Sequence, residues 1–120
     1  ETIITSGNFS LVKVSSTDLK QEAREILKNR KRRQPTTLPS AGCVFKNPLA
    51  GKTAGELIDL CGLKGRKIGG AEISIKHANF IVNTGSATAA DILTLMDSMR
   101  QTVFERYQVN LEPEVIVIGN

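Results

Sequence analysis

The chain has 120 residues, of which 40% are hydrophobic and 23% charged, and it carries a net charge of +4. This size predicts one domain with its own core, and the apolar fraction excludes a disordered chain. The sequence contains no run of 18 apolar residues that could span a membrane. Residues 1–5 show no secretory signal. A single histidine and the lack of a Cys-x-x-Cys pair argue against a zinc site.

The first 31 residues predict a strand followed by an amphipathic helix. Residues 9–14 alternate in polarity as a strand does, and residues 17–31 have the spacing of a helix whose apolar stripe is Leu19, Ala23, Ile26 and Leu27. Five of the six residues from Lys28 to Arg33 are basic. This run suits phosphate binding, and it equally suits favourable charge at a helix C-terminus.

A short strand-like run lies between Pro39 and Pro48 and carries a cysteine. Alternation along a strand over residues 43–47 would place Cys43, Phe45 and Asn47 on one face. Two interpretations of the thiol remain open from these residues alone, namely a buried core cysteine and a thiol presented to a ligand beside the small residue Gly42.

The second cysteine has a packing explanation. Thr53 and Glu56 have the spacing of a capping box, which predicts a helix over 54–61 with the apolar face Ala54, Leu57, Ile58 and Cys61. Gly62 suits the turn that ends this helix. We interpret residues 62–71, which are rich in glycine, as a flexible connector.

A second strand is predicted over residues 78–83, next to the single histidine. Ala78, Phe80 and Val82 would share one face, and the other, mostly polar face would carry His77, Asn79, Ile81 and Asn83. His77 could bind a ligand or act as an acid or base, or it could be a hydrogen-bonded surface residue.

The last predicted elements are a long helix and a strand. Residues 88–108 carry Ile92, Leu95, Met96, Met99, Val103 and Tyr107 at steps of three and four, which predicts a helix laid on a sheet. Ser86 or Thr88 would cap it, and Asn110 would take the left-handed turn after it. Residues 114–118 predict a buried strand. Glu114 at its start could be desolvated, which would raise its pKa, or it could be an exposed strand-end glutamate.

Together these elements predict an α+β fold, with a small mixed or antiparallel sheet and about three helices packed on it. Strand order does not follow from the sequence.

The ordered set of segments resembles one family. These segments are Gln34-Pro35, Pro39 to Pro48, Ala54-Gly55 with Leu57-Ile58, Gly62 to Gly65, Gly69 to Ala71, His77 to Asn83, and Leu111 to Val115 with Ile118-Gly119. They resemble the C-terminal, substrate-binding domain of UDP-N-acetylenolpyruvoylglucosamine reductase (MurB) over residues 32–119. The resemblance implies a domain over 32–120, with residues 1–31 as its lead-in strand and helix.

The resemblance also implies a function. The family enzyme is cytoplasmic and works in peptidoglycan synthesis, where NADPH reduces bound FAD and the flavin passes hydride to the enolpyruvyl group of a UDP-sugar. FAD is held mainly by two N-terminal domains, to which nothing in this chain is similar. The expected partners are therefore the UDP-sugar and those domains, without nucleic acid, membrane or metal.

The site residues follow from the same resemblance. The family's proton donor, usually serine, maps onto Cys43, and its second acid maps onto Glu114. The expected substrate contacts are Asn47, His77, Asn79 and Lys46. A thiol suits proton donation, because an ordinary cysteine is mostly protonated at pH 7.

Two alternatives from other classes are considered. A basic module that binds phosphate or nucleic acid would use the Lys28–Arg33 run, although no aromatic residues interleave with it. A thiol enzyme would pair Cys43 with His77, although no orienting partner is visible.

Overall fold

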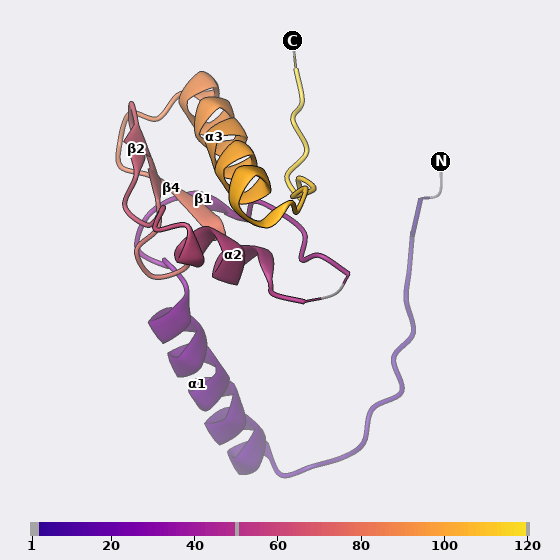
Figure 1. Cartoon of the computed structure of the whole chain (residues 1–120). Helices are drawn as coiled ribbons and strands as arrows, with labels where there is room; N and C mark the ends of the chain where they lie inside the picture. The colour runs from indigo at the N-terminus through magenta and orange to yellow at the C-terminus, as the bar shows by residue number, and fades with distance from the viewer. Residues whose placement is uncertain (1–2, 50, 120) are drawn as a thin grey trace.

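The computed structural model describes residues 3–49 and 51–119, which form three helices and a four-stranded antiparallel sheet (Figure 1). The elements are α1 (Ser16–Arg33), β1 (Ser40–Cys43), α2 (Ala54–Leu60), β2 (Lys67–Ile68), β3 (Ala71–Ile73), β4 (Phe80–Asn83) and α3 (Ala89–Tyr107). The predicted α+β class is confirmed, and every pairing of named strands is antiparallel.

The sheet has the order β1-β4-β3-β2, so β4 is an inner strand. Helix α3 packs against β2 and β3, and α2 packs against α3 (Figure 1). The predicted stripe of α3 is confirmed, because Leu95, Met96, Met99 and Val103 are buried and form the core with Ala54, Leu57 and Ile58 of α2. Burial of each large apolar side chain stabilises the fold by about 1.5–3 kcal/mol.

Both core helices begin at the caps that the sequence predicts. The Thr53 side chain accepts a hydrogen bond from the backbone N–H of Glu56, and Thr88 forms the same capping box with Asp91. Cys61 packs against the core as predicted, partly buried. The left-handed residue after α3 is Gln108, at φ 55°, and the prediction of Asn110 was wrong.

The glycine-rich stretch 62–71 is more ordered than predicted. It contains β2 and the start of β3, joined by a two-residue turn at Gly69-Gly70. Gly69 has φ +53°, and a Cβ on Gly70 would lie 2.3 Å from the backbone nitrogen of Ala87. Glycine is required here because the turn needs a positive φ and the following chain passes against it.

The strand predicted over 43–47 was wrong in its bounds, and the strand predicted over 114–118 does not form among the described residues. β1 ends at Cys43, and beyond it only an isolated bridge joins Phe45 to Pro113 among the described residues. Residues 114–118 follow as an irregular tail in which Ile116 is 86% exposed. The tail has no described neighbour with which to complete a ladder, so its apolar character alone does not make it a strand.

The predicted polar face of 78–83 was also wrong. Asn79 and Ile81 are buried as well as Phe80 and Val82. The strand predicted over 78–83 begins at Phe80, so Asn79 lies in the turn before β4 and does not follow the alternation of the strand.

The predicted lead-in strand, residues 9–14, is extended but forms no ladder with any described residue (Figure 1). The α1 helix forms as predicted, but none of its residues is buried. The expectation that this helix packs on the sheet was therefore wrong for the described part of the chain.

Candidate active site

Cys43 and Glu114 line one open pocket of about 390 Å³, although 71 positions separate them in the sequence. Cys43 ends β1, where it pairs with Phe80, and Gly42 before it has φ +93°, a conformation that favours glycine. The chain around Glu114 runs antiparallel beside the chain after Cys43. The backbone N–H of Glu114 donates to the carbonyl of Val44 at 2.8 Å.

The surroundings of Cys43 keep its thiol protonated. Partial burial raises its pKa above the ordinary cysteine value, and the negative charge of Glu114 raises the pKa further. A contact with the Asn79 side chain acts in the opposite direction and is the smallest of the three effects. Cys43 therefore holds its proton at neutral pH and could give it to a basic carbon.

Glu114 differs from the sequence-based expectation in one respect. Its side chain is exposed in this chain, so the burial that the sequence suggested for it is not present. The contribution of Glu114 that the described residues support is its charge beside the thiol.

Asn79 is buried and holds the backbone immediately after Cys43. Its Oδ1 accepts a hydrogen bond from the Phe45 N–H at 3.0 Å, and its Nδ2 donates to the Phe45 carbonyl at 2.7 Å. Its backbone carbonyl also accepts from the N–H of Val44 at 2.9 Å. The structure thus gives Asn79 a positioning role for the segment that follows the thiol.

Lys46 and Asn47 lie just beyond the pocket and do not line it. The Lys46 ammonium forms an exposed ion pair with Glu112, which is worth little in water and leaves the charge free to exchange toward an anion. The Asn47 Oδ1 accepts from the N–H of Ala54 at 3.1 Å. Asn47 therefore joins the post-Cys43 segment to the N-terminus of α2.

His77 lies in a different pocket from Cys43, together with Lys64 and Glu56. Its ring stacks edge-on against Phe80 with the ring centroids 4.9 Å apart, and its Nδ1 accepts from the N–H of Asn79 at 3.2 Å. Burial and the charge of Lys64 lower the pKa of His77. This placement favours a structural histidine over the base of a Cys43–His77 pair.

Sequence reasoning missed Arg30 as part of the pocket. Arg30 and Gln34 both line it, and the Arg30 Nε donates to the Gln34 Oε1 at 3.0 Å. Their spacing of four residues places both on one side of the end of α1. The four-residue spacing of Arg30 and Gln34 is visible in the sequence. The basic run from Lys28 to Arg33, however, gave no reason to choose Arg30 as the residue that lines the pocket.

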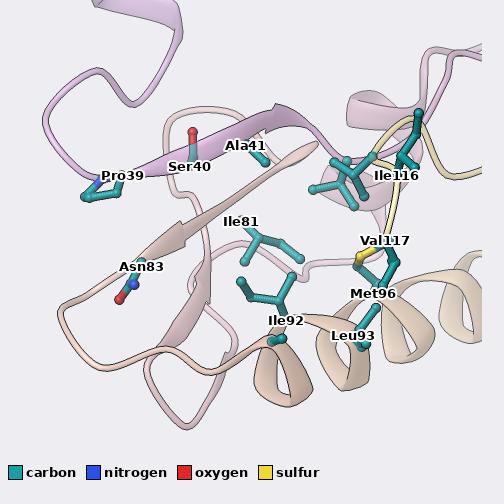
Figure 2. Close-up of a pocket in the computed structure, with 13 residues that line it drawn as sticks. Pro39, Ser40, Ala41, Ile81, Asn83, Ile92, Leu93, Met96, Ile116 and Val117 are labelled. Carbon is teal, nitrogen blue, oxygen red and sulfur yellow. The ribbon is translucent and has the colours of Figure 1, made fainter. Parts of the chain in front are cut away.

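An apolar groove of about 440 Å³ lies beside this pocket, between α3, the inner face of β1 and β4, and the C-terminal tail (Figure 2). The groove is lined by Ile81 of β4, by Ile92, Leu93 and Met96 of α3, and by Val115 to Val117 of the tail. None of its lining residues has an ionisable side chain. The groove offers apolar contact but no acid–base chemistry.

Neither a metal centre nor a membrane span emerges from residues 3–49 and 51–119. No group of three or more acidic, histidine or cysteine side chains there could hold a metal ion. No helix in the same residues is both long and apolar enough to cross a bilayer. The fold and the pocket thus define a small α+β domain that presents a protonated thiol beside a carboxylate on an open surface.

Comparison with known proteins identifies the family. The model of the UDP-N-acetylenolpyruvoylglucosamine reductase C-terminal domain matches residues 34–118. The chain is 48% identical over 117 residues to that reductase from Desulfosudis oleivorans, covering 98% of the chain and 37% of the relative. It is also 48% identical over 117 residues to the reductase from Halalkalibacterium halodurans, covering 98% of the chain and 38% of the relative.

A solved structure agrees with the sequence comparison. A crystal structure of UDP-N-acetylenolpyruvylglucosamine reductase (MurB) from Thermus caldophilus is similar, with a TM-score of 0.70 and 43% identity. The match covers 88% of this chain and 37% of that one. The chain therefore belongs to the UDP-N-acetylenolpyruvoylglucosamine reductase family and corresponds to its C-terminal domain, and it spans a little over a third of these relatives' length.

Proposed function

We propose that this chain is the substrate-binding and proton-donating domain of a flavin-dependent NADPH reductase. The enzyme converts UDP-N-acetylglucosamine enolpyruvate to UDP-N-acetylmuramate in peptidoglycan synthesis, in the cytoplasm. The observation that supports this most is the convergence of Cys43 and Glu114 at one open pocket in a member of this family.

In this proposal, Cys43 protonates the substrate. Addition of hydride to one carbon of the enolpyruvyl double bond places negative charge on the adjacent carbon, which must take a proton. The raised pKa of Cys43 keeps that proton in place until the carbanion forms. The S–H bond then breaks as the new C–H bond forms, and the thiolate is reprotonated from solvent.

Glu114 is the second acid of the site. Its charge disfavours the thiolate before the reaction. When substrate and the rest of the enzyme cover the pocket, the Glu114 carboxyl group would lie beside the enolate and could stabilise it by a hydrogen bond. We propose Lys46, Asn47, Asn79 and His77 as substrate contacts, or as positioning residues where their own side chains are already hydrogen-bonded within the domain.

The family is FAD-dependent. This domain, however, could contact FAD on one side only and has no pocket that would enclose it. The pocket beside Cys43 measures about 390 Å³ and is open, which is near the lower limit for a drug-sized ligand, and FAD is larger. The reduced flavin, held mainly by other segments of the enzyme, would supply the hydride. Flavin absorbance retained through purification of the 120 residues alone would contradict this division.

The proposed division of the chain places the substrate-binding domain at 32–120 and its lead-in at 1–31. Residues 1, 2, 50 and 120 lie outside the described part of the structure. The exposure of α1 supports a boundary near its C-terminal end.

Substitution of Cys43 in the intact enzyme tests the proposal. Cys43→Ser retains a hydroxyl that can donate a proton, so measurable activity should remain, whereas Cys43→Ala should lose most of the activity. Cys61→Ala is the matched control, because Cys61 packs against the core and does not line the pocket. Full activity of Cys43→Ala would exclude Cys43 as the proton donor.

A further inference from the structure

One side chain of the C-terminal tail is held by the rest of the domain. Residues 112–114 and 116–119 are exposed, whereas Val115 is half-buried and packs against the hydrophobic core. Val115 directly follows Glu114, and it lines both the pocket that contains Cys43 and the apolar groove beside that pocket. This valine therefore connects the acidic part of the candidate site to the core.

The backbone register places Val115 across from the thiol. Phe45 forms an antiparallel bridge with Pro113, and the Glu114 N–H donates to the carbonyl that directly follows Cys43 in the chain, at 2.8 Å. Continuing this register two residues beyond the bridge puts Cys43 opposite Val115. Residues directly opposite each other in an antiparallel pair present their side chains on the same face, with Cβ atoms about 4.5–5.5 Å apart. Val115 is thus placed to cover the thiol.

The other side of Cys43 is also apolar. Cys43 pairs with Phe80 of β4, and Phe80 lines the same pocket. The charged side chains that line this pocket are Arg30 of α1 and Glu114 of the tail, and β1 and β4 contribute none. Partial burial is the largest cause of the raised pKa of Cys43, because apolar cover disfavours a thiolate.

We propose that Val115 is a positioning residue for the proton donor, which covers the Cys43 thiol and holds Glu114 beside it. This inference rests on the proposed function and deepens it, because it names what keeps the two acids together. The Glu114 side chain is itself exposed. Its position therefore depends on the backbone hydrogen bond to Val44 and on the packing of Val115 against the core.

Alkylation of Cys43 by iodoacetamide in the intact reductase tests this proposal without any activity measurement. The rate is followed against pH by peptide mass spectrometry, and its midpoint reports the thiol. In Val115→Ala, water reaches the thiol, so the midpoint should fall by about 0.5 pH unit or more, whereas Val115→Ile should keep it. Ile118→Ala is the matched control, since Ile118 is 89% exposed and lines neither cavity. An unchanged midpoint in Val115→Ala would overturn the proposal.

Val115→Thr separates cover of the thiol from stability of the fold. Threonine keeps the β-branched shape of valine but brings a hydroxyl group toward the thiol, so the midpoint should fall in this variant as well. Circular dichroism checks that each variant is folded. A midpoint that falls in Val115→Ala but not in Val115→Thr would overturn the covering role, because loss of packing alone would then explain the shift.

A double variant tests whether Val115 holds Glu114. In a Glu114→Gln background the charge is absent, so Val115→Ala should shift the midpoint less than it does in the unchanged enzyme. Equal shifts in both backgrounds would overturn the holding role. The proposed function fails separately, through full activity of Cys43→Ala, and that result would leave these midpoints as they are.

Discussion

Asn79→Ala should strongly destabilise the domain, because Asn79 satisfies both backbone groups of a residue that is 1% exposed. Truncation would leave the N–H and the carbonyl of Phe45 buried without these partners. Each of the two unsatisfied groups costs about 1–3 kcal/mol, so the free energy of unfolding should fall by about 2–6 kcal/mol. That loss is a large fraction of the ~5–15 kcal/mol typical of a domain.

Urea unfolding of the 120-residue chain, followed by circular dichroism, measures this loss. For a slope of about 2 kcal/mol per molar urea, the midpoint should fall by about 1–3 M. Asn110→Ala is the matched control, since Asn110 is exposed, and it should change the free energy by less than about 0.5 kcal/mol. An equally small effect of Asn79→Ala would refute the positioning role and leave only the proposed substrate contact.

Three further outcomes are expected. Glu114→Gln should lower the pH midpoint for alkylation of Cys43, because the charge that raises the thiol pKa is removed. Glu112→Gln is the control and should leave this midpoint unchanged. An unshifted midpoint in Glu114→Gln would contradict the effect of the Glu114 charge on the Cys43 thiol. Gly42→Ala should cost about 1–3 kcal/mol in the same urea assay, because φ +93° strains any residue with a Cβ, and an unchanged midpoint would show that the strain is absent. The pKa of His77, measured by NMR, should lie below its usual value. The unfolded chain then binds the proton more readily, so stability should fall as the pH drops through about 6.5; a raised His77 pKa would reverse that sign.

The helical part of the fold was readable from local sequence. Helices α2 and α3 each combine a capping box with a stripe at helical spacing, and both signals come from neighbouring residues. The β2–β3 hairpin was missed because its strands have two and three residues, too few for alternation to be visible. The Gly69-Gly70 pair was the remaining signal, and it was interpreted as flexibility.

The wrong strand predictions share a physical cause. An apolar or alternating run shows that a segment can form a strand, but a strand also needs a neighbour. Residues 9–14 and 114–118 have the composition of strands and lack a ladder among the described residues. Local sequence contains no information on where the neighbouring strand comes from.

The candidate site residues were predicted from the resemblance and not from local patterns, and their roles remain predictions. No spacing rule connects Cys43 to Glu114, and the structure brings them together through the Phe45–Pro113 bridge. The effect of Glu114 on the thiol depends on that approach, so it could not be read from the sequence. The burial of Asn79 could not be predicted from the sequence either, because an amide side chain at that position is also compatible with a ligand contact.

In the proposed mechanism, Cys43 delivers the proton after hydride has reached the substrate. Rapid-mixing absorbance of the intact enzyme separates the two half-reactions. In Cys43→Ala, reduction of the flavin by NADPH should proceed at the normal rate, while reoxidation of the reduced flavin by the enolpyruvyl UDP-sugar should slow at least about 100-fold, within the range typical of a lost acid catalyst. Normal reoxidation in Cys43→Ala would contradict the account, and so would equal slowing of both half-reactions.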